Sequence, residues 1–299
     1  MSLKEEILKV CPNTKFDEPM KNNTTFKIGG NADVFCEPES VWELQELLKL
    51  LKTNNIKPMV IGNGSNLLVK DNGIRGVVIK IGEKMSNVKV DKNKVEAEAG
   101  ILLSRLSNFI LKNSLKGFEC MSGIPGTLGG AVFMNAGAYG GEMSQVVAEV
   151  TAIDENGEIK TFKKDELMFG YRKSVFNKNN MIIVSCVLEL EKGNKDEIEA
   201  KIKELTRQRC EKQPLNFPSA GSTFKRPEGY FAGKLIEDCN LKGFRVGGAK
   251  ISEKHAGFVI NSDNATAKDV LDLMDRVMEK VFSEFGVKME PEVKIIGEE

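Results

Sequence analysis

The sequence predicts an α+β protein, because helical and strand-like segments first alternate and hairpins then intervene. Capping residues and apolar periodicity indicate helices over 40–55, 101–116 and 270–285, and a more polar helix over 196–210. Asn156-Gly157 lies between two strand-like runs, and this pair is typical of a hairpin turn. With 299 residues, the chain is long enough for about two compact units.

The predicted helices have recognisable ends. Ser40 and Glu43 form the pattern of a capping box, in which a hydroxyl and a carboxylate satisfy each other's backbone N–H groups. Asn54-Asn55 and Gly117 are expected to end the first two helices, and Gly286 is expected to end the last one. Apolar residues at helical spacing give each of these helices one face that should be buried.

Strand-like runs rich in apolar residues lie between and after these helices, at 58–61, 77–81, 95–99, 147–153, 158–162, 181–190 and 293–296. The proline-containing segment 213–218 follows the polar helix and marks the expected boundary between two domains. The last strand comes after the final helix, so we expect it to return to the first domain.

The charges of the chain are balanced, with 43 basic and 43 acidic side chains and a formal net charge of zero. This balance removes the electrostatic basis for binding nucleic acid or a membrane surface. No apolar run approaches the roughly 20 residues needed to cross a bilayer, and the N-terminus lacks the pattern of a signal peptide. The six cysteines form no C-x-x-C pair, which is typical of reduced thiols and predicts a cytoplasmic protein.

His255 is the only histidine of the sequence. A site built from several histidines is therefore excluded, and we expect no metal. A Ser-His-Asp triad would need His255, but the sequence contains no G-x-S-x-G pattern to accompany it. An enzyme of this composition is expected to use a cofactor for its hard chemistry and a group other than histidine to move a proton.

Two glycine-rich segments indicate a bound phosphate or flat ring. The segment 62–66 follows a strand, and a turn of its composition presents several backbone N–H groups to one side. Between 117 and 141, eight of 25 residues are glycine, whereas average usage predicts about two. Glycines let a ligand approach the backbone closely, although an ordinary turn and a tightly packed crossover would explain the same two patterns.

Ordered motifs along nearly the whole chain resemble a known flavoprotein family. The segments 24–30, 62–66 and 123–130 resemble the PCMH-type flavin-binding fold of the vanillyl-alcohol-oxidase superfamily. Within it, the segments 171–176, 220–227 and 290–294 resemble the family of UDP-N-acetylenolpyruvoylglucosamine reductases. Because these motifs occur in family order, their combination is specific.

The resemblance implies two FAD-binding subdomains over 1–85 and 86–210, a UDP-sugar domain over 211–287, and a C-terminal strand over 288–299 that returns to the FAD-binding region. It implies non-covalent FAD, NADPH as the hydride source and the small UDP-sugar as partner, with no nucleic acid, no membrane insertion and a monomeric chain. The residues expected at FAD are Gly62, Asn63, Gly64, Ser65, Asn66, Gly123, Pro125, Gly126, Thr127, Gly129, Gly130, Ala131 and Gly137.

Three residues match catalytic positions of the family. By the resemblance, Ser222 is the proton donor, while Arg172 and Glu292 are polar groups around the enolpyruvyl unit. Hydride addition to an alkene beside a carboxylate builds enolate charge, which an arginine can stabilise through its fixed fork of donors. Taken alone, each residue has a structural explanation. Arg172 would be an ordinary surface arginine, Ser222 a turn residue, and Glu292 a solvated charge at a strand edge.

Four residues are expected to contact the substrate. Tyr139 resembles a substrate tyrosine of the family, and otherwise it would be an aromatic plug over the glycine loop. Lys212, Lys225 and Arg226 are expected near the UDP diphosphate, since cations recognise phosphate oxygens, although each alone would be an ordinary surface charge. The short segment 190–208 has no tyrosine, so the chain resembles the shorter subtype of the family.

Two alternatives remain open at this point. Another flavoprotein of the superfamily would oxidise a small alcohol or hydroxy acid, but the motifs at 221–227 and 290–294 argue against it. A non-catalytic nucleotide-binding protein could keep the fold, but it would be expected to lose one of the three catalytic residues. His255 is expected to be a structural residue of the substrate domain.

Overall fold

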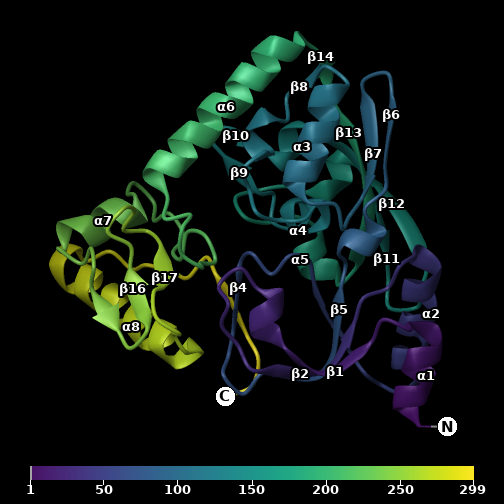
Figure 1. Ribbon diagram of the computed structural model, residues 1–299, viewed down its shortest axis with the longest axis horizontal. Helices are drawn as coiled ribbons and strands as arrows, with labels where there is room; N and C mark the ends of the chain where they lie inside the picture. Colours follow the sequence, from purple (N-terminus) through teal and green to yellow (C-terminus); the bar gives the residue numbers. More distant parts are fainter. Residues whose placement is uncertain (1) are drawn as a thin grey trace. The chain divides into compact units, whose positions relative to one another are not determined.

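The computed structural model describes residues 2–299, which divide into two compact units (Figure 1). Unit 1 contains the residues up to Lys15 together with Val34–Asn63 and Gly76–Gln208. Unit 2 contains Phe16–Asp33, Gly64–Arg75 and Arg209–Glu299. Each unit is therefore assembled from segments that lie far apart in the sequence.

Unit 1 is built on a five-stranded antiparallel sheet with the order β12-β11-β13-β7-β6. Its strands are β6 (Val88–Asp91), β7 (Lys94–Glu98), β11 (Val147–Ile153), β12 (Ile159–Lys163) and β13 (Ile182–Glu189). The predicted turn between β11 and β12 is confirmed: Gly157 has φ +80°, and the Asp154 carboxylate accepts the N–H groups of Asn156 and Glu158.

Helices and short strands surround this sheet in unit 1. They are α1 (Leu3–Val10), α2 (Val41–Thr53), β3 (Met59–Ile61), α3 (Leu103–Lys112), β8 (Leu115–Lys116), α4 (Leu128–Phe133), β9 (Gly137–Ala138), β10 (Gly141–Glu142), α5 (Phe176–Asn179) and β14 (Glu191–Lys192). The 3-10 helices are η2 (Glu83–Met85), η3 (Glu119–Met121), η4 (Met143–Gln145) and η5 (Lys164–Leu167). α4 packs against β7 and β13.

Four elements contain a boundary between the units. β1 (Lys15–Pro19) begins in unit 1 and continues in unit 2 from Phe16. β2 (Asn31–Cys36) and β5 (Ile74–Lys80) begin in unit 2 and end in unit 1, and the last turn of α6 (Lys195–Lys212) belongs to unit 2. A four-stranded sheet has the order β1-β2-β5-β3. β3 pairs with β5 in parallel.

Unit 2 has a three-stranded antiparallel sheet of β15 (Arg245–Val246), β16 (Ala249–Ile251) and β17 (Val259–Asn261), and α8 (Ala267–Phe285) packs against β15 and β16 (Figure 1). It also contains η1 (Met20–Asn23), β4 (Leu67–Val69), α7 (Ala232–Asp238) and β18 (Lys294–Ile296). β18 pairs with β4 in parallel, so the end of the chain joins residues 67–69. The core combines Phe26 and Leu68 with Val270 and Val277 of α8.

Most of the predicted elements are present, with shifted ends. α8 starts at a Thr266 capping box and ends at Gly286, which has φ +67°. The capping box predicted for α2 is wrong in one half: Ser40 accepts the N–H of Glu43 at 3.2 Å, but the Glu43 carboxylate accepts the N–H of Glu39. The predicted helix 101–116 ends at Lys112, because residues 115–116 pair with β14 instead.

No helix within residues 2–299 combines the length and the apolar character that crossing a bilayer requires.

Candidate active site

The two glycine-rich segments meet in unit 1. The Asn63 side-chain amide donates to the Pro125 carbonyl oxygen at 2.6 Å. A Cβ built on Gly62 would lie only 2.3 Å from the Thr127 hydroxyl oxygen. Close packing of the two loops therefore requires a glycine at 62, which accounts for one residue of the sequence pattern.

The second loop is fixed to the sheet on one side and open on the other. The N–H of Gly129 donates to the Ala99 carbonyl at 2.8 Å, and a Cβ on Gly129 would lie 2.8 Å from the Cβ of Ala99. Gly126 accepts the N–H of Leu103, and Ala131 is buried in α4. A Cβ on Gly130 would meet only the Thr127 hydroxyl within 4 Å, at 3.4 Å. Gly130, Gly123 and Pro125 are exposed.

An FAD fits this arrangement. The open side at Gly130 lets a flat ring or a pyrophosphate approach the backbone, because no side chain projects from that position. The Thr127 hydroxyl accepts the N–H of Gly130 at 3.4 Å and caps α4, which orders the backbone around the opening.

The rest of the first glycine segment belongs to unit 2. Gly64 has φ +62°, and a Cβ there would lie 2.2 Å from the carbonyl oxygen of Asn23. The Asn66 amide donates to the Glu292 carbonyl at 3.1 Å, and its own carbonyl accepts the N–H of Lys294. Asn66 therefore fixes the backbone of a predicted catalytic residue. Ser65, which lies between Gly64 and Asn66 in the sequence, is half-buried.

Tyr139 lies at the tip of the hairpin formed by β9 and β10. Its φ is +52° and its side chain is 37% exposed. Gly137, in β9, faces Gly141 closely, since a Cβ would lie 2.6 Å from the Gly141 carbonyl oxygen. The tyrosine therefore stands on a tight turn rather than covering the glycine loop as a buried plug.

Arg172 also lies at the tip of a tight turn in unit 1. Gly170 and Lys173 exchange two backbone hydrogen bonds of 3.0 and 3.2 Å around it. Arg172 has φ +54°, and its guanidinium lies 5.0 Å from the ring centre of Tyr171. Two residues that sequence reasoning did not single out, Asn135 and Ser174, form hydrogen bonds that hold this turn. They lie inside the segments 117–141 and 171–176, but nothing in those patterns indicates this contact.

The segments that carry Ser222 and Glu292 pair with each other in unit 2 through backbone hydrogen bonds. The N–H of Glu292 donates to the Thr223 carbonyl, and the N–H of Lys225 donates to the Glu290 carbonyl, both at 2.8 Å. The Thr223 hydroxyl is buried and accepts the N–H of Val259 at 3.0 Å. Ser222 is exposed at the end of this ladder, and Glu292 is half-buried.

The predicted diphosphate cations are in unit 2 and differ in their surroundings. The Lys225 amine pairs with the Glu290 carboxylate at 2.6 Å, which holds the pKa of that carboxyl below its ordinary value. The Arg226 guanidinium stacks 3.9 Å from the ring centre of Phe231 and donates to the Tyr230 carbonyl. Lys212 is exposed at the end of α6.

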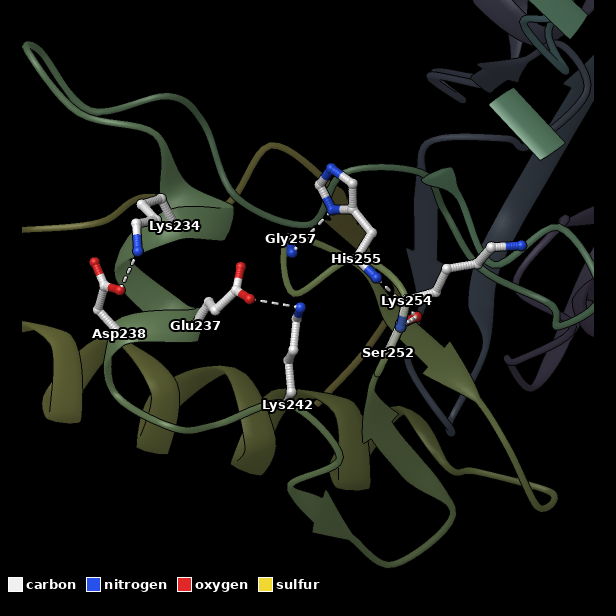
Figure 2. A network of polar contacts seen from close by, with 8 residues as sticks. All are labelled: Lys234, Glu237, Asp238, Lys242, Ser252, Lys254, His255 and Gly257. Atoms are coloured by element: carbon white, nitrogen blue, oxygen red, sulfur yellow. Dashed lines mark hydrogen bonds and ion pairs between the residues drawn. The ribbon is translucent and has the colours of Figure 1, made fainter. Parts of the chain in front are cut away.

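His255 lies in a turn where it forms hydrogen bonds with Ser252 and Gly257, as Figure 2 shows. Its Nδ1 accepts the N–H of Gly257 at 3.1 Å, and its backbone N–H donates to the Ser252 hydroxyl at 3.3 Å. The Gly257 carbonyl in turn accepts the N–H of Thr223 at 2.9 Å. Burial lowers the pKa of the imidazole, which favours the neutral ring that can accept this hydrogen bond.

Unit 2 also has an open cavity of about 900 Å³. Residues from the 24–30 motif and from the loop 261–266 line it, and none of the predicted catalytic residues does. Within residues 2–299, no group of three or more His, Cys, Asp and Glu side chains could hold a metal ion.

Comparisons with known proteins agree with this architecture. Residues 213–296 match the family described as UDP-N-acetylenolpyruvoylglucosamine reductase, C-terminal domain, and residues 32–163 match the family described as FAD binding domain. The UDP-N-acetylenolpyruvoylglucosamine reductase of Alkaliphilus oremlandii is 56% identical over 283 residues, which cover 95% of this chain and 93% of the relative. That of Clostridioides difficile is 51% identical over 285 residues, with 95% and 94% covered.

A solved structure extends the similarity to the fold. The crystal structure of UDP-N-acetylenolpyruvylglucosamine reductase from Thermus caldophilus matches with a TM-score of 0.80 and 35% identity, covering 95% of this chain and 98% of that one. The expected α+β, FAD-binding fold and the predicted resemblance are confirmed. The chain is therefore a member of the UDP-N-acetylenolpyruvoylglucosamine reductase family.

Proposed function

We propose that this protein reduces UDP-N-acetylglucosamine enolpyruvate to UDP-N-acetylmuramate in peptidoglycan precursor synthesis, with NADPH as the source of hydride. The chain is an FAD-dependent oxidoreductase by its family and its FAD-binding domain. The structural observation that supports the residue assignment is the backbone ladder of unit 2, in which Thr223, the residue after exposed Ser222, accepts the N–H of Glu292.

FAD would be held by the two loops that meet in unit 1, through Gly62, Asn63 and the segment 123–131. Gly137, in the hairpin that comes next in the chain, would also contact FAD. Gly64, Ser65 and Asn66 lie in unit 2, where Asn66 also holds the strand of Glu292. When bound, FAD supplies the hydride that reaches the substrate. We assign 1–85 and 86–210 to the FAD-binding subdomains, 211–287 to the substrate domain, and 288–299 to the returning strand, an assignment supported by the pairing of β18 with β4.

Arg172 would stabilise the charge that develops on the substrate. Hydride adds to one alkene carbon, and the electron pair of the double bond moves toward the adjacent carbon and its carboxylate. A guanidinium next to that carboxylate favours the enolate over the ground state, since more charge lies on the oxygens there. The fixed backbone of the turn keeps the fork of donors in one orientation.

Ser222 would deliver the proton that completes the reduction. Its hydroxyl proton passes to the second alkene carbon, and because Ser222 is exposed, water restores the proton afterwards. Glu292 would orient the substrate or the hydroxyl from the neighbouring strand. The balance is one hydride from NADPH, which leaves as NADP⁺, and one proton from Ser222 for each double bond reduced.

We assign Tyr139, Lys212, Lys225 and Arg226 to substrate binding, and the three cations to the diphosphate. Lys225 would exchange its Glu290 partner for phosphate oxygens, which accept similar charge-assisted hydrogen bonds. We also propose that the protein is a cytoplasmic monomer. Its six free thiols, four of them buried, are in accord with a reducing compartment.

One set of measurements tests this function. The purified protein should be yellow, release FAD on denaturation, and oxidise NADPH in a manner that depends on UDP-N-acetylglucosamine enolpyruvate. A colourless protein that cannot be reconstituted with FAD would exclude the enzyme. Turnover with simple alcohols or hydroxy acids, and none with the UDP-sugar, would favour the alternative flavoprotein instead.

A further inference from the structure

Within its own segment, the turn that carries Arg172 is closed by backbone hydrogen bonds between Gly170 and Lys173 and from the Val175 N–H to the Leu167 carbonyl at 2.9 Å. Arg172 adopts a left-handed backbone with φ +54°, a conformation that residues with a Cβ disfavour. Its two backbone hydrogen bonds form an isolated bridge between Gly170 and Lys173. A two-stranded hairpin by itself is only marginally stable in water, so contacts from elsewhere must hold Arg172 in place.

Two side-chain hydrogen bonds supply that support, one at each side of the turn. The Asn135 amide donates to the Gly170 carbonyl at 3.2 Å. On the other side, the Ser174 hydroxyl donates to the Phe133 carbonyl at 2.8 Å. Both tethers lead to residues 133–135, which are the last residue of α4 and the two residues after it.

Asn135 is built into this position. It is 1% exposed and has φ +44°, and its side-chain oxygen accepts the N–H of Ser144 at 2.9 Å. The same amide group therefore joins the end of α4, the Arg172 turn and the segment after the Tyr139 hairpin. Because Asn135 is buried, removing its amide would leave the N–H of Ser144 without its side-chain acceptor and would release Gly170.

α4 connects this anchor to the predicted cofactor loop. The helix begins at Thr127, which contacts Gly62 of the first loop, and ends at Phe133, the acceptor of the Ser174 tether. Six helical residues span only about 9 Å. The distance from the loop to the Arg172 turn is therefore set inside unit 1 by one short, rigid element.

We propose that Asn135 is a positioning residue: together with Ser174, it fixes the turn of Arg172 relative to the cofactor loop through α4. This inference rests on the proposed function only for the role of Arg172. Asn135 needs no contact with substrate or cofactor. Its loss should impair the step that uses Arg172 and leave FAD binding and reduction by NADPH intact.

The first test compares the half-reactions in the FAD-loaded protein. Asn135→Ala is expected to reoxidise roughly 10- to 100-fold more slowly with UDP-N-acetylglucosamine enolpyruvate, because a small misplacement of a catalytic group costs this much. Its rate of reduction by NADPH and its FAD content should match those of the unmodified protein. Ser174→Ala should show the same split with a smaller loss.

Asn93→Ala is the matched control. Asn93 also lies in unit 1, is half-buried, and donates its amide to a backbone carbonyl, that of Leu190 at 3.1 Å. Asn93→Ala, like Asn135→Ala and Ser174→Ala, should lower the urea concentration at the midpoint of unfolding. It should leave the rates of both half-reactions unchanged. If Asn135→Ala reoxidises slowly only because it is less stable, Asn93→Ala should reoxidise slowly as well.

The second test does not depend on activity. Trypsin cleavage after Arg172 or Lys173, mapped by mass spectrometry, reports how often the turn opens. Asn135→Ala should raise this cleavage about 5- to 10-fold, because proteolysis follows the population of the open form. Asn93→Ala should not change it.

The outcomes separate this inference from the proposed function. If the unmodified protein ignores the UDP-sugar but Asn135→Ala opens the turn, the function fails and the anchoring stands. Unchanged cleavage at the turn, or normal reoxidation despite increased cleavage, would overturn the role of Asn135. If Asn135→Ala does not fold, Ser174→Ala decides the matter by the same two criteria.

Discussion

The two units hold their predicted catalytic residues by different means. In unit 1, Arg172 sits on a left-handed turn fixed by the side chains of Asn135 and Ser174. In unit 2, the segments that carry Ser222 and Glu292 are joined by backbone hydrogen bonds between 223–225 and 290–292. Every residue has a backbone carbonyl acceptor, and every residue except proline has an N–H donor, whereas the tethers of Arg172 need a particular amide and a particular hydroxyl.

The predicted catalytic residues of the two units should therefore respond differently to substitution. Substitutions of neighbouring side chains should disturb the orientation of Arg172 more than that of Ser222. In unit 2 the supporting side chains act on the backbone. The Asn66 amide donates to the Glu292 carbonyl. His255 accepts the N–H of Gly257, and the Gly257 carbonyl accepts the N–H of Thr223. The predictions below act on one unit at a time.

The largest effect is expected for Ser222, the proposed proton donor in unit 2. Ser222→Ala should slow reoxidation by the UDP-sugar roughly 10²- to 10⁴-fold, the usual range for a lost general acid, and leave flavin reduction by NADPH near normal. Rapid mixing of each half-reaction measures this. Ser219→Ala is a nearby control, since Ser219 uses its carbonyl, and not its hydroxyl, to accept from Thr25. Equal losses in both half-reactions would reject Ser222 as the acid.

A smaller loss is expected for the charge stabiliser of unit 1. Arg172→Ala should lower kcat/KM for the UDP-sugar about 10²- to 10³-fold, comparable to removing one preorganised donor. Arg172→Lys keeps the charge but lacks the planar fork, so it should recover only part of the rate. Full activity of the lysine variant would show that charge alone is enough and that the fixed turn has no catalytic value.

Two glycines of unit 1 should give opposite effects on the protein without FAD. Gly62→Ala should destabilise it by about 1–3 kcal/mol, because its Cβ would overlap the Thr127 hydroxyl. Gly130→Ala should stabilise it by about 0.5–1 kcal/mol, since alanine favours the helix and has room. Both should weaken FAD binding in a fluorescence titration. If Gly130→Ala binds FAD normally, the open side of the loop is not where FAD lies.

The smallest effect concerns pH and His255. Because burial lowers its pKa in the folded state, the unfolded chain binds a proton that the folded chain resists, and stability falls as pH drops below about 6.5. His255→Gln should lose less stability than the unmodified protein between about pH 7 and 5. Urea unfolding at both pH values measures this difference. An equal loss in the two proteins would show that other groups cause it.

Local signals predicted much of the fold. α8 has a cap, a regular apolar face and a terminal glycine, and the Asp154–Gly157 turn has its own side-chain hydrogen bonds, so both can be derived from adjacent residues. α4 was missed because its six residues include two glycines, which are poor helix formers. β15, β16 and β17 have two or three residues each, too few to show an alternating pattern.

The assembly of the units and the support of the site were not predictable in this way. Phe26 and Leu68 join the core of α8 across about 200 residues, and no local pattern indicates that partnership. The segment 117–141 was identified by its unusual glycine content, but its packing against Gly62 and Asn63 was not predicted. Asn135 looks like any loop asparagine, since its role depends on an acceptor 35 residues away.

The most direct test of the account mixes the reduced, FAD-loaded protein with UDP-N-acetylglucosamine enolpyruvate in the absence of oxygen. We expect the reduced protein to be reoxidised and one UDP-N-acetylmuramate to form per FAD. A protein that stays reduced with the UDP-sugar, and whose oxidised form is instead reduced by a small alcohol or hydroxy acid, would contradict it.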